Sequence, residues 1–303
     1  MNTITIGSRG SKLALFQSQQ VQDSLLKAHP VIDISISVIQ SKGDKELDKP
    51  IHELGGKAAF IVELEEALVS HRIDLAVHSL KDLPCILPDD LMYTGSPQRE
   101  DVRDVFVSTK WKTIDDVPVN GIIATGSQRR KAQLLHKRPD LNIQGLRGNI
   151  DTRLRKLDQS TWDGIITAAA AMHRLGLQNR ISQYLLPDCF VPAGGQGALG
   201  LEIAADREDI KTIASSIIDK NTTLCCQAER LYLTQMEVDC FAPIGCWARI
   251  EKEIFLITGF SSRRDGKESI IKTVQGNIVE AKKLALKLAE TMIKNGAREL
   301  MSS

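Results

Sequence analysis

Arg72-Ile73-Asp74-Leu75-Ala76-Val77 and Thr161-Trp162-Asp163-Gly164-Ile165-Ile166 are two stretches of the chain that share one pattern. In each stretch, an aspartate separates the end of a predicted helix from a short apolar run. Short apolar runs that alternate with helices indicate βαβ units, in which buried strands form a mostly parallel sheet. The two stretches therefore predict an α/β protein with two similar, doubly wound lobes.

The sequence around each stretch supplies the other elements of a lobe. In the first lobe, apolar periodicity and turn residues predict strands at 3–6, 32–39 and 73–78 and helices at 12–28 and about 58–71. In the second lobe, the same signals predict strands at 121–125, 141–146 and 164–167 and helices at 128–137 and 150–158. The polar segment Ser41 to Gly56 is predicted to be a mobile loop.

Past Asn221 the pattern changes to a helix, two or three antiparallel-looking strands and a closing helix, which predicts a small C-terminal α+β domain. We therefore expect a first lobe of residues 1–97 plus about 198–216, a second lobe of residues 103–191, and a C-terminal domain of residues 220–303. The glycine-rich segment 191–197 is predicted to be a crossover or hinge between the lobes. Its glycine spacing fits no nucleotide-binding loop.

Composition narrows the class of ligand. The chain has 303 residues, of which 42% are hydrophobic and 25% charged, and its net charge is +1. A dedicated nucleic-acid binder is normally basic, so an anionic ligand should be a small molecule held in a pocket. The sequence shows neither a membrane-spanning apolar stretch nor a secretory signal, which predicts a cytoplasmic protein. The six cysteines show no metal-binding spacing, so we expect free thiols and no metal.

Arginines gather at two predicted helix starts, within residues 125–130 and 146–153. Ser127 and Asp151 are the predicted N-caps of these helices. A helix N-terminus repels cations and attracts anions, so arginines placed there indicate a site for carboxylates or phosphates. The alternative is that these arginines point into water and are screened. Arg9, in the same setting near the N-terminus, favours the anion site.

Two further residues could carry out chemistry. Asp82 follows the predicted strand 73–78, at the edge of the sheet where open α/β proteins bind ligands. It is a candidate general acid or base, and a turn cap is the alternative; His78 nearby fits a core histidine better than a partner of Asp82. Cys240, in a constrained loop, is a candidate nucleophile. An inert thiol is the alternative there, because the adjacent Asp239 opposes ionisation.

These residues belong to ordered motifs that run nearly from end to end of the chain. The motifs are Ser8-Arg9-x-Ser11-x-Leu13-Ala14-Leu15, Gly55-Gly56-Lys57, His78 to Pro84, Arg99-Glu100-Asp101-x-Arg103-Asp104, Ser127-x-Arg129-Arg130, Leu146-Arg147-Gly148-Asn149, Thr152-Arg153-Leu154, Arg174-Leu175-Gly176, residues 191–197 and Cys240-x-x-Pro243-Ile244-Gly245. Through them the chain closely resembles the hydroxymethylbilane synthases, also called porphobilinogen deaminases.

The resemblance implies a cytoplasmic, monomeric transferase of tetrapyrrole biosynthesis with three domains. Such an enzyme joins four porphobilinogen molecules head to tail, releases ammonia each time, and frees hydroxymethylbilane by hydrolysis. It implies one dipyrromethane cofactor per chain, attached through a thioether to Cys240. No metal, nucleotide, nucleic acid or membrane takes part.

The resemblance also implies roles for individual residues. Asp82 matches the family's catalytic aspartate and is expected to donate a proton as ammonia leaves. Porphobilinogen carries an acetate and a propionate, and a guanidinium holds a carboxylate with two parallel hydrogen bonds. The residues expected to hold the cofactor, besides Cys240, are Lys57, Ser79, Lys81, Asp82, Ser127, Arg129, Arg130, Arg147 and Gly148. The residues expected to hold substrate are Arg9, Ser11, Arg147, Arg153 and Arg174.

The chain departs from the family pattern at Glu53, Ala58, Cys246 and Val238-Asp239, the last of which replaces the usual Gly-Gly before Cys240. These departures bear on the cofactor loop. A rival interpretation is a non-catalytic, two-lobed anion-binding protein, because such lobes resemble those of periplasmic binding proteins. It explains the arginines and the hinge, but it leaves Asp82 and Cys240 together without a role.

Overall fold

The computed structural model describes residues 3–40, 61–237 and 242–302. The predicted loop at 41–56 and the residues Lys57, Ala58 and Cys240 lie outside the described residues. The fold separates into two compact units, Met1–Glu100 with Ala198–Thr223 (unit 1) and Asp101–Gly197 with Leu224–Ser303 (unit 2). The chain thus passes between the units three times.

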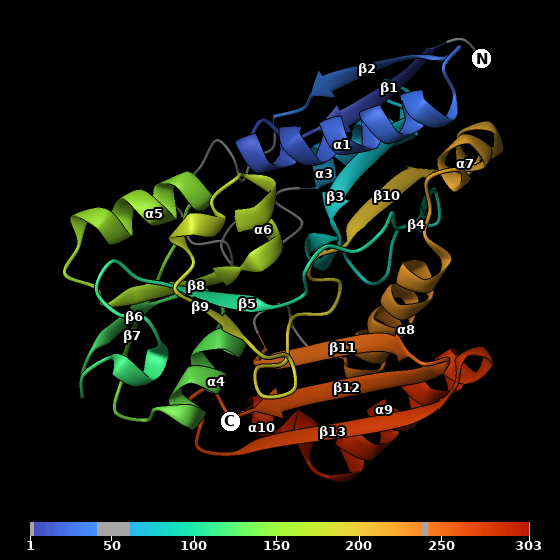
Figure 1. Ribbon diagram of the computed structural model, residues 1–303. Coiled ribbons are helices and arrows are strands. Elements are labelled where there is room, and N and C mark those ends of the chain that lie inside the picture. Colours follow the sequence, from blue (N-terminus) through green and yellow to red (C-terminus); the bar gives the residue numbers. More distant parts are fainter. Residues whose placement is uncertain (1–2, 41–60, 238–241, 303) are drawn as a thin grey trace. The chain divides into compact units, whose positions relative to one another are not determined.

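Unit 1 is built on a five-stranded sheet in the order β2-β1-β3-β10-β4 (Figure 1). Its elements are β1 Thr3–Ser8, α1 Lys12–Ala28, β2 Asp33–Val38, α3 Val62–Val69, β3 Leu75–Ser79, β4 Leu91–Gly95, β10 Leu199–Ala204 and α7 Glu208–Ser215. Strand β1 is parallel to β2 and β3, whereas β10 is antiparallel to β3 and β4. The carboxyl ends of β1 and β3 therefore lie at the same edge of the sheet.

Different helices cover the two faces of this sheet. Alternate residues of β1, β3 and β10 form an apolar face, because side chains alternate along a strand. Helices α1 and α7 pack on that face through Val21, Leu25, Ile210 and Ala214. Helix α3 packs on the opposite face, which includes Ala76.

Unit 2 contains a second five-stranded sheet in the order β7-β6-β8-β5-β9. Its elements are β5 Asp104–Val107, β6 Ile122–Ala124, α4 Gln128–Lys137, β7 Asn142–Gln144, α5 Ile150–Gln159, β8 Gly164–Ala168, α6 Ala169–Arg174 and β9 Gln183–Leu185. Strands β7, β6 and β8 are parallel, and β5 is antiparallel to β8 and β9. Helix α4 packs on one face through Leu134, against Phe106, Ile123 and Ile166.

The rest of unit 2 is a three-stranded antiparallel sheet with helices. Its elements are α8 Lys220–Met236, most of which belongs to unit 2, β11 Ile244–Glu251, β12 Ile254–Ser262, β13 Ser269–Asn277, α9 Ala281–Lys294 and α10 Ala297–Ser302. The strands pair in chain order. Tyr232, Phe255 and Leu288 are among the buried residues of its core.

The predicted fold class is confirmed: two α/β lobes and a small C-terminal α+β domain. Helices Lys12–Ala28 and Gln128–Lys137 have the predicted bounds. The three-domain division and its boundaries stay a prediction. No helix among the described residues is long and apolar enough to cross a membrane.

Each five-stranded sheet is mostly parallel, as predicted, and in each a single strand, β10 or β5, runs antiparallel to its neighbours. One detail of the fold differs from expectation. The N-cap of α5 is Asn149, whose side chain accepts a hydrogen bond from the Thr152 N–H (2.9 Å), whereas the predicted cap Asp151 lies in the first turn.

Candidate active site

In unit 1, five of the predicted site residues lie at or just after the carboxyl ends of the parallel strands β1 and β3. Arg9 comes directly after β1. Ser11 is the N-cap of α1, and its hydroxyl accepts a hydrogen bond from the Ala14 N–H (3.2 Å). Ser79, the last residue of β3, accepts a hydrogen bond from the buried Gln17 side chain of α1 (2.8 Å). These contacts tie the start of α1 to the end of β3.

Lys81 and Asp82 lie in a single 3₁₀ turn, Leu80–Asp82, that continues β3. The turn is fixed to β10 by a hydrogen bond from the Leu80 N–H to the Ala198 carbonyl oxygen (3.0 Å). The side chain of Asp82 is partly buried. Sequence alone therefore places Asp82 correctly at the carboxyl end of a buried strand.

His78 is a buried core histidine, as its setting favoured. Its Nε2 lies 2.8 Å from the Glu202 carboxylate, and the Glu202 side chain is fully buried in β10. Strands β3 and β10 are thereby joined by a buried polar contact as well as by their backbone ladder. Within the described residues, the side chain of His78 contacts Glu202 and makes no hydrogen bond with Asp82.

In unit 2, the carboxyl ends of β6 and β7 approach each other closely. The Thr125 N–H donates to the Gln144 carbonyl oxygen (2.9 Å). A Cβ at Gly126 would lie 2.5 Å from the Leu146 carbonyl oxygen, so only glycine permits this approach. The close approach brings the loop that precedes α4 beside the loop that holds Arg147.

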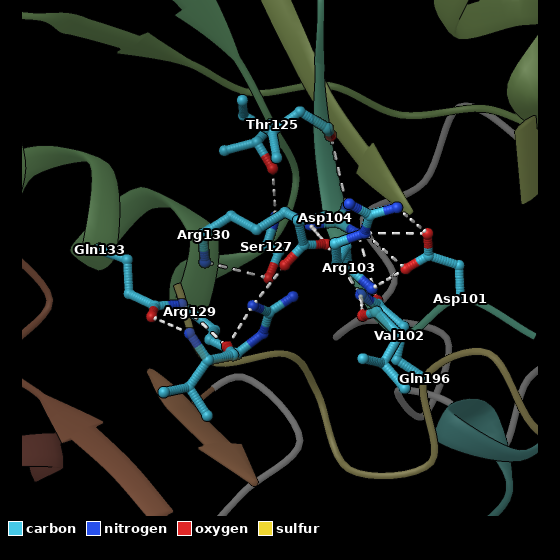
Figure 2. Close-up of polar contacts among 12 residues, drawn as sticks. Asp101, Val102, Arg103, Asp104, Thr125, Ser127, Arg129, Arg130, Gln133 and Gln196 are labelled. Carbon is cyan, nitrogen blue, oxygen red and sulfur yellow. Dashed lines mark hydrogen bonds and ion pairs between the residues drawn. The ribbon is translucent and has the colours of Figure 1, made fainter. Parts of the chain in front are cut away.

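Arg129 and Arg130 lie in the first turn of α4, behind its N-cap Ser127. Both side chains are buried, with 4% and 6% exposed, and both bind the same carboxylate, that of Asp104 at the start of β5. Figure 2 shows the two guanidinium groups around this carboxylate. Arg129 Nη1 lies 2.7 Å from Oδ2, and Arg130 Nε lies 2.9 Å from Oδ1.

Asp104 stays ionised although no part of it is exposed. Burial alone would raise the pKa of Asp104, but the positive charges of Arg129 and Arg130 outweigh burial and hold the pKa well below its ordinary range. Two cations share one anion, so the pair retains one positive charge that no described partner neutralises.

The segment 191–197 is fastened to this charged cluster. The Gln196 side chain donates to Asp104 Oδ1 (3.0 Å), and Arg129 donates to the Val191 carbonyl oxygen (2.7 Å). The buried Glu229 of α8 accepts a hydrogen bond from the Gly195 N–H (2.6 Å). The chain passes from unit 2 to unit 1 after Gly197, at the end of this segment. A hinge at this segment stays a prediction.

The remaining predicted site residues of unit 2 lie in the loop and helices that follow β7 and β8. Arg147 and Gly148 follow β7, and Gly148 has a φ of +113° that favours glycine. Arg153 Nε donates to the Gly148 carbonyl oxygen (2.8 Å), which fixes the loop. Arg174, at the end of α6, is buried and donates to the Gly197 carbonyl oxygen (2.8 Å).

A second acid–arginine pair lies just before β5. Arg103 binds Asp101 through Nε and Nη2, at 2.9 and 2.6 Å from Oδ2 (Figure 2). Its guanidinium stacks 4.1 Å from the Tyr184 ring centroid. Burial opposes ionisation of Asp101, but hydrogen bonds from Arg103 outweigh it and lower the pKa of Asp101. The ion pair between Arg103 and Asp101 thus also fixes the segment that leads into Asp104.

The structure brings together two sets of predicted residues. Unit 1 holds Arg9, Ser11, Ser79, Lys81 and Asp82, and unit 2 holds Ser127, Arg129, Arg130, Arg147, Gly148, Arg153 and Arg174. Lys57 and Cys240 lie outside the described residues. Sequence reasoning missed the buried polar partners Asp104, Gln196, Glu202 and Glu229. Asp104 and Gln196 lie inside two of the motifs quoted above, so those motifs were the signal that could have identified them.

Comparison with known proteins assigns the family. Residues 4–212 match the family model "Porphobilinogen deaminase, dipyromethane cofactor binding domain", and residues 223–294 match "Porphobilinogen deaminase, C-terminal domain". The porphobilinogen deaminase of Syntrophobacter fumaroxidans is 41% identical over 298 residues, covering 98% of this chain and 96% of that protein. That of Clostridium novyi is 41% identical over 295 residues, covering 96% and 98%.

Among solved structures, an ABC transporter periplasmic substrate-binding protein from Coxiella burnetii is similar with a TM-score of 0.46 at 12% identity. The match covers 71% of this chain and 91% of that one. The family models and the relatives together span nearly the whole sequence. The chain belongs to the porphobilinogen deaminase family.

Proposed function

We propose that this chain is a hydroxymethylbilane synthase, which joins four porphobilinogen molecules head to tail, releases ammonia at each addition and frees hydroxymethylbilane by hydrolysis. The observation that carries the proposal is the buried Arg129–Arg130 pair, which shares one carboxylate at the strand ends of a chain from this family. Family membership disfavours the rival anion-binding protein without catalysis. Cytoplasmic location and a monomeric state stay predictions.

The residues of unit 2 fit a dipyrromethane cofactor. Such a group carries two acetates and two propionates, and the arginine pair keeps an uncompensated positive charge beside the N-terminus of α4. When bound, the group supplies the free pyrrole α-carbon at which chain growth begins. We propose that Ser127, Arg129, Arg130, Arg147 and Gly148 hold its carboxylates, with Lys57, Ser79, Lys81 and Asp82, and that Cys240 anchors it.

The carboxylates of the substrate, like those of the cofactor, need hydrogen-bond donors. We propose this role for Arg9, Ser11, Arg147, Arg153 and Arg174, because each porphobilinogen brings an acetate and a propionate. Arg9 and Ser11 stand where β1 meets the N-terminus of α1, and Arg147 and Arg153 stand at the start of α5. Both sites combine a guanidinium with backbone N–H groups of a helix start, a combination that suits anions.

Asp82 is the proposed general acid. Its protonated carboxyl donates a proton to the amino nitrogen of bound porphobilinogen; the carbon–nitrogen bond then breaks and ammonia leaves with the electron pair of that bond. The resulting carboxylate offsets positive charge on the pyrrole nitrogen. Asp82 suits a catalytic rather than a structural role, because no described residue donates a hydrogen bond to its carboxylate.

Incubation of the purified protein with porphobilinogen tests the proposal by measuring ammonia and hydroxymethylbilane. The wild type should form both, and Asp82→Asn should fold normally but lose about 10²–10⁴-fold in turnover, the usual contribution of general acid catalysis. Asp89→Asn, an exposed aspartate of the same unit, is the matched control and should retain turnover. Near-normal turnover of Asp82→Asn would refute the acid role, and an inactive wild type would refute the function.

A further inference from the structure

The two buried arginines of α4 use their donors differently. Every guanidinium nitrogen of Arg130 has a partner within the protein. Its Nε and Nη2 bind Asp104 at 2.9 and 2.7 Å, its Nη1 lies 3.3 Å from the Ile166 carbonyl oxygen, and Nη2 also lies 3.4 Å from Gln196 Oε1. Each guanidinium nitrogen of Arg130 thus has at least one partner in its own protein. Figure 2 shows the contact of Arg130 with Asp104.

Among the described residues, Arg129 is bound through one guanidinium nitrogen only. Its Nη1 donates both to Asp104 Oδ2 and to the Val191 carbonyl oxygen, each at 2.7 Å. Within residues 3–40, 61–237 and 242–302, its Nε and Nη2 have no hydrogen-bond partner. These two nitrogens form the edge of a guanidinium that presents parallel N–H groups, and this edge binds a carboxylate with two hydrogen bonds.

An independent contact places Arg129 beside the entry to β11. A Cβ at Gly245 would lie 3.2 Å from Arg129 Cδ, so the stem of Arg129 passes directly over this glycine. The same Cβ would lie 2.9 Å from the Pro192 carbonyl oxygen, which rules out a larger residue without movement of the backbone. Gly245 follows the predicted cofactor cysteine, Cys240, by five residues.

We propose that Asp104 is a positioning residue that holds Nη1 of Arg129 and so directs the Nε–Nη2 edge toward a carboxylate of the cofactor. This inference rests on the proposed function and deepens it. Asp104 touches no substrate in this account and acts through Arg129. Gln196 assists, because its amide donates both to Asp104 Oδ1 (3.0 Å) and to the Val102 carbonyl oxygen (2.8 Å) and thus fixes the carboxylate.

A displaced Asp104 should impair cofactor assembly more than folding. Glutamate in its place keeps the charge and lengthens the side chain by one methylene, so the arginine pair stays neutralised but Arg129 shifts. Misplacement of a binding group by about 1 Å can cost about 10²-fold in rate. Asp104→Asn, which leaves two buried cations unpaired, is expected to destabilise the fold strongly, so Asp104→Glu is the deciding variant.

The experiment measures the intact mass of cofactor-free protein against time after porphobilinogen is added, together with thermal unfolding. Asp104→Glu should unfold cooperatively and gain the mass of the cofactor about 10- to 100-fold more slowly than the wild type. Arg129→Lys should show a similar delay, because lysine cannot offer two parallel N–H groups. The double variant should be little slower than Arg129→Lys alone, because both changes act on one contact.

Asp163→Asn is the matched control. Asp163 is a half-buried carboxylate of unit 2, bound to Trp111 Nε1 (2.9 Å) and to the Ile122 N–H (2.8 Å). It precedes β8, whereas Asp104 pairs with Ala168 at the carboxyl end of that strand. Its loss should lower the melting temperature without slowing the mass gain. If Asp104 has only a structural role, Asp104→Glu and Asp163→Asn should slow the mass gain equally when they lower the melting temperature equally. That result would overturn the proposal.

An Asp104→Glu protein that gains mass at the wild-type rate would also overturn it, while leaving the proposed function intact. Additive delays in the double variant would show that Asp104 does not act through Arg129. A wild type that gains no mass from porphobilinogen would instead count against the proposed function itself.

Discussion

Tyr232 places its phenolic hydroxyl in the core of the C-terminal sheet and helices, where the residue is 0% exposed and the hydroxyl has no hydrogen-bond partner among the described residues. Burial raises the pKa of Tyr232 well above its ordinary value of 10.0, and the nearby Cys246 adds to the effect. An unpaired buried hydroxyl costs about 1–3 kcal/mol. Tyr232→Phe should therefore increase the free energy of unfolding by about 1 kcal/mol in urea titrations. A decrease would show that the hydroxyl is satisfied.

Glu65 of α3 gives the stability a dependence on pH. Burial and, second, the charge of Glu202 raise the pKa of Glu65 above its ordinary value of 4.5, while His78 opposes them. The folded protein thus favours the protonated acid. The contribution of Glu65 to the free energy of unfolding is present below pH 4.5. It is lost as the pH rises through the raised pKa of Glu65 in the folded protein.

Glu65→Gln should consequently raise the melting temperature at pH 8 and leave it nearly unchanged at pH 4. Glu66→Gln, on the exposed side of the same helix, is the control and should change neither value. A lower melting temperature for Glu65→Gln at pH 8 would mean that the ionised carboxylate stabilises the fold.

At the scale of residues, sequence identified the cations but not their partners. Arg129 and Arg130 stood out because helix starts disfavour positive charge. Asp104 was not distinguished, because its burial and its two arginines result from tertiary packing of β5 against α4, which no local pattern reports. The cap of α5 was misassigned for a similar reason: Asn149 and Asp151 are both good caps, and only backbone geometry selects Asn149.

At the scale of elements, the turn that carries Asp82 depends on a glycine in β10. A Cβ at Gly200 would lie 2.9 Å from Leu80 Cδ1 and 3.4 Å from Leu83 Cδ2. Gly200→Ala should therefore push the Leu80–Asp82 turn outward and lower turnover about tenfold, since small displacements of catalytic groups are costly. Stability should fall less, because the neighbouring atoms belong to flexible leucine ends.

A second substitution checks this explanation. Leu80→Val removes the Cδ1 atom that the new methyl group would meet, so turnover of Gly200→Ala with Leu80→Val should recover toward the level of Leu80→Val alone. Steady-state rates and melting temperatures of the three variants decide the matter. If turnover does not recover in the double variant, the effect of Gly200→Ala does not arise from contact with the Leu80–Asp82 turn.

Sequence predicted the helices better than the strands. Helices Lys12–Ala28 and Gln128–Lys137 begin at the serine caps Ser11 and Ser127, which are strong local signals. Strand β10 was missed although Leu199, Leu201 and Ile203 alternate along it, and its burial on both faces shows only in the folded chain. Its antiparallel direction follows from a long-range event, the return of the chain from unit 2 to unit 1.

At the scale of the whole molecule, each unit carries its own part of the predicted chemistry. Unit 1 holds Asp82, and unit 2 holds the arginine pair. The two family models confirm the family assigned from ordered motifs. Sequence sufficed for this assignment because the motifs are local in sequence and spread along the chain. The boundaries of three domains stay a prediction, since contacts alone divide the described chain into two units.

We propose that the chain carries a dipyrromethane on Cys240 and uses it to polymerise porphobilinogen. The intact masses of the purified wild type, Cys240→Ser and Cys189→Ser test it most directly, with the exposed Cys189 as the matched thiol control. We expect an excess equal to two porphobilinogens less two ammonias in the wild type and in Cys189→Ser, and none in Cys240→Ser. Unmodified mass in the wild type after incubation with porphobilinogen, or an excess that survives in Cys240→Ser, would contradict it.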